Sequence, residues 1–176
     1  MRKIIKNKKK GILFWVTGLS GSGKTTLSKK IKKDITNLYG PTIVVSGDDL
    51  RKIFNLNKYE YKDRLLVSYK FSKFAKFITD QKINLIFAAV GMIHSLRNRL
   101  KKNIKNYLEI YIKSDIKKII QFKKKKVYHR KNTGALVGIS IKPEFPKNPN
   151  IIINNNFKKS SDELAKILIK KIKDIV

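Results

Sequence analysis

One short stretch, residues 18–25, constrains this chain more than any other. It reads Gly-Leu-Ser-Gly-Ser-Gly-Lys-Thr, the glycine spacing before Lys-Thr that forms a phosphate-binding loop (P-loop). A compact apolar run at residues 12–16 precedes it, and a helical pattern carrying Leu27, Ile31 and Ile35 follows it. The alternative is a glycine-rich turn that arose by chance and binds nothing. Such a turn would not be expected between a strand and a helix. The sequence therefore predicts a site for nucleotide phosphates.

Each part of this loop has an expected contact. The glycines let successive backbone N–H groups point at phosphate oxygens, and the next helix adds its positive N-terminal end. Lys24 is expected to act in catalysis by reaching the β- and γ-phosphates, and the Thr25 hydroxyl to bind Mg²⁺. ATP and Mg²⁺ are thus the expected cofactors. The predicted ATP-binding residues are Gly18, Leu19, Ser20, Gly21, Ser22, Gly23, Lys24, Thr25 and Thr26.

Apolar runs alternate with helical patterns along the rest of the chain. We expect further strands at residues 42–45, 84–90, 107–112 and 150–153. This alternation predicts an α/β fold of the P-loop NTPase kinase type, with a five-stranded parallel sheet and helices on both faces. With 176 residues and one P-loop, the chain is expected to form a single kinase domain over residues 1–176.

The helical patterns lead to three more detailed predictions. A long helix is expected over residues 63–79, with one side expected to pack in the core rather than to form a binding surface. That side carries Leu66, Tyr69, Phe74 and Phe77. A basic helix is expected over residues 98–105. Ser160 and Glu163 have the spacing of a capping box, which predicts that they open the last helix.

Two segments are expected to lie outside these elements. Residues 1–10 form a basic N-terminal tail, and residues 123–149 carry glycines and prolines without periodicity. The second segment is predicted to be a lid that closes over a ligand, or else a surface connector. His129 lies in it and is a candidate for contact with ATP phosphates.

The charge of the chain is unusual, because 42 Lys and Arg stand against 12 Asp and Glu, a formal net charge of +30. A polyanion partner is one interpretation. The lysines are spread along every helix and no nucleic-acid motif appears, which favours a solvated surface and argues against a nucleic-acid partner. The absence of cysteine excludes disulfides and thiolate zinc sites. No apolar run suits a signal peptide or a membrane span, so a cytoplasmic enzyme without a membrane partner is expected.

The second expected strand ends at residues 46–51, Ser-Gly-Asp-Asp-Leu-Arg. In open α/β sheets, ligands bind just beyond the carboxyl ends of the strands. Asp48 is therefore predicted to be catalytic, either by orienting Mg²⁺-bound water or by accepting the proton of the attacked hydroxyl. The alternative for Asp48 and Asp49 is capping of the helix that follows, and one of the two is expected to do so.

Residues 15–26, Trp-Val-Thr-Gly-Leu-Ser-Gly-Ser-Gly-Lys-Thr-Thr, resemble the P-loop region of the adenylylsulfate (APS) kinases. The resemblance continues through residues 47–51, at Asp63-Arg64, and at residues 138–139 and 144–149. It implies transfer of the γ-phosphate of ATP to the ribose 3′-hydroxyl of adenylylsulfate, giving 3′-phosphoadenylylsulfate. It also implies a small nucleotide as the acceptor and, by analogy, a homodimer.

The resemblance carries further roles onto single positions. Asp48 stands where the family has its catalytic aspartate. Arg51 and Arg64 are implied to hold the phosphate or sulfate of the acceptor, with ordinary surface ion pairs as the alternative. Tyr59 lies near an aromatic that stacks on the acceptor base. The predicted substrate-binding residues are Asp48, Arg51, Tyr59, Arg64, Gly138 and Ile139, and the predicted metal-binding residues are Thr25 and Asp48.

The acceptor side departs from the family pattern at several positions. Ser46 replaces an aspartate and Val67 an asparagine, while Leu136 replaces an aromatic of the base clamp. Residues 91–94 read Gly-Met-Ile-His instead of S-P-Y-R, so a phosphoserine route is not expected. A lid arginine–aspartate pair appears as Phe122-Lys123. Adenylylsulfate is the acceptor by family default, and cytidine diphosphoramidate, the acceptor of an APS-kinase-like group in capsule modification, is the alternative.

Two other classes of function stay open at this point. One is a non-catalytic nucleotide- or nucleic-acid-binding protein, favoured only by the charge and opposed by Lys24, Thr25 and Asp48. The other is a kinase for a metabolite that is not a nucleotide. His94 follows the third expected strand, where it either touches the acceptor or is a polar loop residue.

Overall fold

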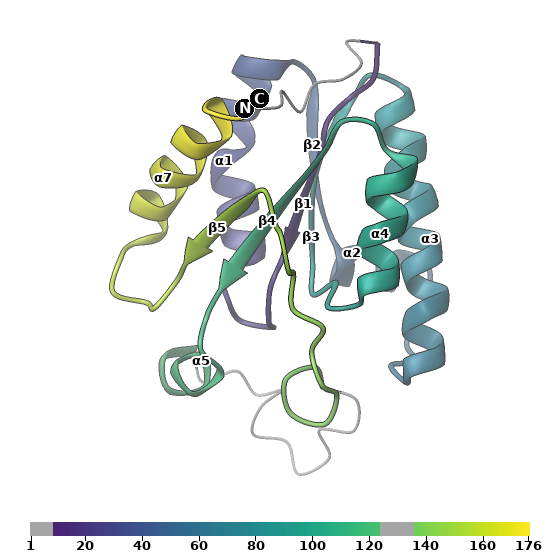
Figure 1. Ribbon diagram of the computed structural model, residues 1–176, viewed down its shortest axis with the longest axis vertical. Coiled ribbons are helices and arrows are strands. Elements are labelled where there is room, and N and C mark those ends of the chain that lie inside the picture. The colour runs from purple at the N-terminus through teal and green to yellow at the C-terminus, as the bar shows by residue number, and fades with distance from the viewer. Residues whose placement is uncertain (1–8, 124–135) are drawn as a thin grey trace.

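A five-stranded parallel sheet forms the centre of the computed structural model, which describes residues 9–123 and 136–176 (Figure 1). The strand order is β2-β3-β1-β4-β5, and every neighbouring pair is parallel. The predicted sheet is confirmed. The strands are β1 (Leu13–Thr17), β2 (Thr42–Ser46), β3 (Asn84–Ala89), β4 (Tyr107–Lys113) and β5 (Ile151–Asn154).

The helices cover both faces of this sheet, as predicted (Figure 1). Phe14 and Val16 of β1 face one side and pack in one cluster with residues of α1 and α7, whereas Leu13 and Trp15 face the other side, with residues of α3 and α4. This alternation follows from the two-residue period of a strand. The helices are α1 (Lys24–Tyr39), α2 (Gly47–Ile53), α3 (Tyr61–Asp80), α4 (His94–Asn103), α5 (Ile116–Lys123) and α7 (Ser161–Lys173).

The central strands are buried and largely apolar because both of their faces are covered. All five residues of β1 and all six of β3 are buried. The edge strand β5 alternates buried and exposed residues instead. Continuous apolar runs are therefore typical of the inner strands, as expected for a parallel sheet.

Two helix predictions need correction. On α3, Leu66, Tyr69 and Phe77 are exposed, so their predicted place in the core is wrong. The core side of α3 instead carries Val67, Phe71 and Ala75, whose spacing by four residues selects one face of the helix. The basic helix predicted over residues 98–105 begins earlier, at His94, and ends at Asn103.

The capping prediction for the last helix agrees with the structure. Ser160 is the N-cap of α7, and its side chain and that of Glu163 form the expected reciprocal capping box. Asp115 accepts hydrogen bonds from the N–H groups of Lys117 and Lys118 at the start of α5.

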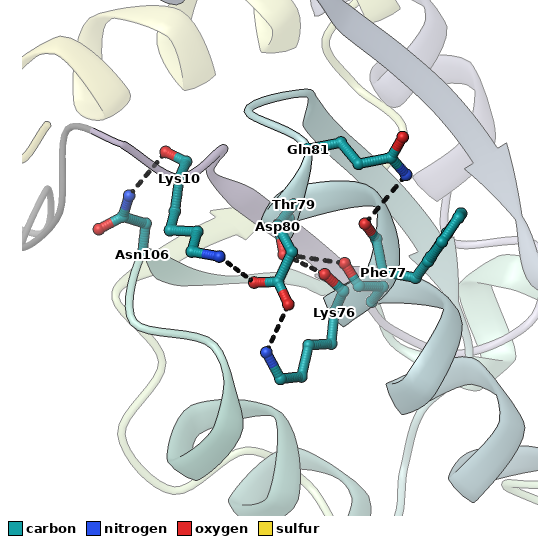
Figure 2. A network of polar contacts seen from close by, with 8 residues as sticks. Lys10, Lys76, Phe77, Thr79, Asp80, Gln81 and Asn106 are labelled. Atoms are coloured by element: carbon teal, nitrogen blue, oxygen red, sulfur yellow. Dashed lines mark hydrogen bonds and ion pairs between the residues drawn. The ribbon is translucent and has the colours of Figure 1, made fainter.

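Figure 2 shows a polar network that joins the end of α3 to the chain just before β1. The Asp80 carboxylate contacts Nζ of Lys10 at 3.0 Å and Nζ of Lys76 at 2.6 Å. Asn106 donates to the carbonyl of Lys10, and Gln81 donates to that of Phe77. This network lies at the end of the sheet where the central strands begin, away from the P-loop.

Candidate active site

The chain leaves β1 at Thr17 and turns through the P-loop into α1. A side chain at Gly18 would place its Cβ 2.6 Å from the carbonyl oxygen of Ile112, so only glycine fits there. Gly23 is the N-cap of α1 in the left-handed region, at φ 97°, and no side chain caps this helix. The first N–H groups of α1 are thus directed toward the P-loop, as anion binding at a helix N-terminus requires.

Two side chains of the P-loop suit a polyphosphate. Lys24 is only 8% exposed, and its Nζ donates a 2.8 Å hydrogen bond to the carbonyl of Leu19. The hydroxyl of Ser22 is buried and has no hydrogen-bond partner among the described residues. This arrangement fits the triphosphate of ATP, because it offers the cation of Lys24, the hydroxyl of Ser22 and the uncapped N-terminus of α1. Thr25 and Thr26 are exposed on the first turn of α1.

The predicted metal-binding residues, Thr25 and Asp48, fit Mg²⁺ as oxygen ligands. Within residues 9–123 and 136–176 there is no group of three or more His, Cys, Asp or Glu side chains that could hold a metal ion. Mg²⁺ in phosphoryl-transfer sites is commonly held by one or two protein oxygens together with substrate phosphates and water. The Thr25 hydroxyl and the Asp48 carboxylate are exposed oxygens of this kind.

Asp48 and Asp49 are adjacent in the chain and have different surroundings. Asp49 forms a reciprocal capping box with Ser46, with both hydrogen bonds at 3.1 Å, so Asp49 is the capping member of the pair. Asp48 is exposed and forms no hydrogen bond with a described residue. The register aligns Ser46 with Ala88, and Ala88 is the neighbour of Ala89, which pairs with Thr17. The P-loop and the start of α2 therefore lie at the same edge of the sheet.

Arg51, Tyr59 and Arg64 form one cluster next to α2. The guanidinium of Arg51 lies 4.5 Å from the centre of the Tyr59 ring, and that of Arg64 lies 5.9 Å from it. Arg51 donates to the carbonyls of Leu56 and Lys58, and Arg64 donates to that of Tyr59, so both arginines also hold the loop. The structure thus brings these three residues together, with the Tyr59 ring packed against the two cations.

The two arginines lie in an environment that favours an anion. Burial lowers the pKa of Arg51, an effect that nearby Tyr59, Asp48 and Asp63 oppose. Burial also lowers the pKa of Arg64, and the positive charge of Arg51 lowers it further. Two cations that repel each other would be stabilised by a bound phosphate or sulfate.

Gly138 and Ile139 lie in a second group of residues, whose contacts differ from those of the arginine cluster. Gly138 has a φ of 97°, and a Cβ there would lie 3.1 Å from a side-chain methyl of Leu19 in the P-loop. The neighbouring Val137 is buried in a small apolar cluster with Leu19 and Met92. Ile139 is 48% exposed. Residues 124–135 of the predicted lid, including His129, lie outside the described residues.

A cavity of about 310 Å³ beside α1 contains residues that the sequence did not single out as binding residues. The rings of Phe122 and Phe157 stack there with centres 5.8 Å apart. Phe157 has a φ of 65°, which is uncommon for a residue with a side chain. The cavity is lined by Gly23, Thr26, Leu27, Phe122, Asn155, Phe157, Lys159, Ser161 and Leu164.

Asn155 links this cavity to the P-loop. Its side-chain amide donates 2.9 Å to the carbonyl of Ser22, while its Oδ1 accepts from the N–H of Phe157. The only sequence signal was a run of three asparagines after the fifth strand, residues 154–156. The run can be related to the P-loop only when the sheet order, which places β5 beside β4, is known.

This fold and site define a P-loop kinase: a parallel sheet in the order β2-β3-β1-β4-β5, a P-loop between β1 and α1, and an aspartate after β2. Residues 10–154 match the family described as adenylylsulphate kinase. The chain belongs to the adenylylsulphate kinase family, and it is an ATP-dependent phosphotransferase.

Individual relatives differ in the acceptor that their names give. The chain is 33% identical over 163 residues to a cytidine diphosphoramidate kinase of Campylobacter jejuni subsp. jejuni serotype O:2, covering 91% of this chain and 95% of that one. It is 27% identical to an adenylyl-sulfate kinase of Clostridium kluyveri, covering 90% and 82%.

Among solved structures, the fold resembles that of the Mycobacterium tuberculosis APS kinase in complex with AMPPNP and APS. The TM-score is 0.81 at 23% identity, and the match covers 93% of this chain and 98% of that one. Within the described part of this chain, no helix has the length and apolar content needed to cross a membrane.

Proposed function

We propose that this protein transfers the γ-phosphate of ATP to the ribose 3′-hydroxyl of cytidine diphosphoramidate. The observation that carries this choice is the similarity along nearly the full length of both chains to a kinase named for that acceptor. The acceptor side supports it, because Leu136 replaces an aromatic of the family's base clamp. A pyrimidine offers less surface than a purine and needs less stacking area.

The arginine cluster supports an acceptor with a diphosphate-like linkage. Arg51 and Arg64 are half-buried, and their guanidinium groups lie beside the same ring. A guanidinium binds planar oxyanions through parallel N–H groups, and two of them suit a group with more than one negative charge. Tyr59 is 48% exposed and can still offer part of its ring to the base.

Adenylylsulfate is the second candidate acceptor. The matching family is named for it, and the Clostridium kluyveri relative carries the same name. Both acceptors share a ribose 3′-hydroxyl, a negatively charged linkage and a small terminal group, so the arginine cluster serves either. The base is what distinguishes them.

The transfer assigns a separate task to each residue. Lys24 leaves the Leu19 carbonyl and binds the β- and γ-phosphates, while the backbone N–H groups of the P-loop hold the other oxygens. Asp48 accepts the proton of the 3′-hydroxyl. At the same time the hydroxyl oxygen bonds to the γ-phosphorus, and the bond between that phosphorus and the departing ADP oxygen breaks. Mg²⁺, when held by Thr25 and Asp48, supplies positive charge at the phosphates.

The cavity beside α1 is the proposed place of the donor base. It adjoins Gly23 and Thr26 at the start of the P-loop helix, which is where a nucleotide held by its phosphates would direct its base. Phe122 and Phe157 provide aromatic surface, and stacking on a base requires little else.

A direct test measures ADP release with a panel of acceptors and identifies the phosphorylated position by ³¹P NMR. We expect turnover with cytidine diphosphoramidate and a product carrying a 3′-phosphate. Turnover with adenylylsulfate alone would select the second candidate. Failure of both nucleotides together with activity on an unrelated alcohol would contradict the proposal. Lys24→Ala protein is the negative control for contaminating kinases.

A further inference from the structure

The buried side chain of Arg97 joins four parts of the chain beside the site. Arg97 lies on α4 and is only 5% exposed. Its Nη1 donates 2.7 Å to the carbonyl of Gly91, and its Nη2 donates 2.7 Å to the carbonyl of Glu144. Its Nε lies 3.1 Å from Oε1 of Glu109 on β4. One guanidinium therefore fixes the loop after β3 to the segment around Glu144 that precedes β5.

Glu109 is the counterion that allows this arginine to be buried. It lies on β4, where it pairs with Trp15 of the central strand. Burial raises the pKa of the Glu109 carboxyl, and the charge of Arg97 opposes that rise. Separating two opposite charges that are buried away from water would leave each of them uncompensated, so the pair stays together. Arg97 therefore has one fixed position from which to act on its neighbours.

The fourth contact of Arg97 decides where His94 carries its ring proton. Nη2 of Arg97 lies 2.6 Å from Nδ1 of His94. A guanidinium has donors and no acceptor, so Nδ1 must be the bare nitrogen and the proton must be on Nε2. The backbone N–H of His94 donates to Oε2 of Glu144, which serves as the cap that Ile93, the N-cap residue, does not provide.

This arrangement leaves His94 with one ring donor, Nε2–H, which bonds to no described residue. His94 follows the carboxyl end of β3. The last residues of β3, Ala88 and Ala89, pair with Ser46 just before α2 and with Thr17 just before the P-loop. The loop that leads to His94 therefore starts between the ATP side and the Asp48 side of the site, at the edge of the sheet where ligands bind.

We propose that Arg97 is a positioning residue that holds His94 in the Nε2–H form, and that His94 uses this proton to select the acceptor nucleotide. The partner is an oxygen or an unprotonated ring nitrogen of that nucleotide. This rests on the proposed function, because it needs a nucleotide acceptor. Arg51 and Arg64 bind the negatively charged groups of the acceptor, whereas His94 contributes a directional hydrogen-bond donor without charge. Ring position and orientation are fixed before the acceptor arrives, which favours discrimination.

The first arm of the test is a long-range ¹H–¹⁵N NMR spectrum of the free full-length protein. The chain has two histidines, so His129→Gln assigns the two ring signals. We expect His94 as the Nε2–H tautomer in the wild type and a mixture of tautomers in Arg97→Lys, which keeps the charge and loses the fork geometry. A proton on Nδ1 of wild-type His94 would overturn the proposal, whatever the protein phosphorylates.

The second arm compares two amides at position 94 with whichever nucleotide turns over in the acceptor panel. Glutamine can place an N–H near the position of Nε2, and asparagine is too short. We expect His94→Gln to keep the acceptor KM within about threefold of wild type and His94→Asn to raise it about 10- to 100-fold, with the ATP KM unchanged in both.

The combined outcomes separate this inference from the proposed function. Equal acceptor KM values for wild type and His94→Asn would overturn the role of His94, even in an active kinase. If Arg97 were only structural, Arg97→Lys would lower the melting temperature and the kcat while the His94 tautomer stayed the same, and that result would overturn its positioning role. A panel in which only adenylylsulfate reacts would correct the acceptor and leave this inference in place.

Discussion

The side-chain amide of Asn155 donates a 2.9 Å hydrogen bond to the backbone carbonyl of Ser22. The loop after the last strand thus supports the P-loop directly, across 133 residues of sequence. The same side chain accepts from the N–H of Phe157, so it also holds one of the two stacked rings in place. Donor phosphates and donor base are therefore expected to depend on a single buried amide.

Asn155→Ala is expected to weaken both functions of that amide. Losing the hydrogen bonds to the Ser22 carbonyl and from the Phe157 N–H should lower the free energy of unfolding by about 1–3 kcal/mol and raise the KM for ATP. Urea unfolding and initial-rate kinetics measure the two effects. Asn154→Ala is the matched control, since Asn154 is exposed, and it should change neither value.

Lys24→Ala is expected to abolish turnover, because no other described side chain at the P-loop supplies the charge at the β- and γ-phosphates. The fold should persist, since the hydrogen bond of Lys24 to the Leu19 carbonyl lies within the P-loop itself. ADP release gives the activity and circular dichroism checks the fold. Lys29→Ala, on an exposed position of the same helix, should behave as wild type. Activity of Lys24→Ala near the wild-type value would refute the mechanism.

Asp48→Asn and Asp49→Asn form a matched pair with opposite expected effects. Asp48→Asn should lower kcat by about 10²- to 10⁴-fold with little change in ATP affinity, because it removes the proposed proton acceptor. Asp49→Asn should instead cost about 0.5–2 kcal/mol of stability through the α2 capping box and leave kcat close to wild type. Calorimetric ATP binding and single-turnover kinetics test both. The opposite pattern would move the catalytic role to Asp49.

Phe122→Ala tests the proposed donor-base cavity. Phe122 is 56% exposed, so its truncation should cost little stability while removing one of the two stacked rings. We expect the KM for ATP to rise about 3- to 10-fold, in line with about 0.5–1.5 kcal/mol for an aromatic contact, with the acceptor KM unchanged. A change confined to the acceptor KM would show that the cavity binds something other than the donor base.

The Asp80 network in Figure 2 gives a prediction for pH. The hydrogen bond from Lys76 and the contact with Lys10 lower the pKa of Asp80. Its stabilising contribution is therefore complete above the ordinary aspartate pKa of about 3.9 and is lost as the pH falls through the lower folded-state value.

Asp80→Asn measures that contribution. Because Asp80 is partly exposed, the loss at neutral pH should be about 0.2–1 kcal/mol, and it should shrink in high salt and at acid pH. Thermal melts at several pH values and salt concentrations follow it. Activity should be unchanged, since this network lies away from the P-loop, and a loss of activity without a loss of stability would contradict the assignment.

Local patterns predicted the parts of this structure that depend on local chemistry. The apolar runs predicted the parallel sheet, because the inner strands of such a sheet are buried on both faces. The glycine spacing and Lys24-Thr25 predicted the P-loop, and the Ser160–Glu163 spacing predicted a cap that the structure contains. Each of these depends on residues within a few positions of one another.

The features that sequence reasoning missed depend on contacts between distant segments. Phe77 and Phe74 are neighbours on α3 by pattern, yet Phe77 is exposed while Phe74 packs on Phe87, because the sheet covers only one side of the helix. Arg97 precedes the basic helix predicted over residues 98–105, and its burial depends on Glu109 from the next strand. A single sequence cannot show such pairings.

The apolar cluster beneath the site has a consequence for changing its substrate. Leu19 comes from the P-loop, Met92 from the loop that leads to His94, and Val137 from the turn before Gly138, and all three share one set of contacts. Altering the volume of any one shifts the backbone that holds the others. Attempts to evolve this enzyme toward a new acceptor should therefore randomise Leu19, Met92 and Val137 together, because single substitutions at the acceptor side will also change how ATP is held.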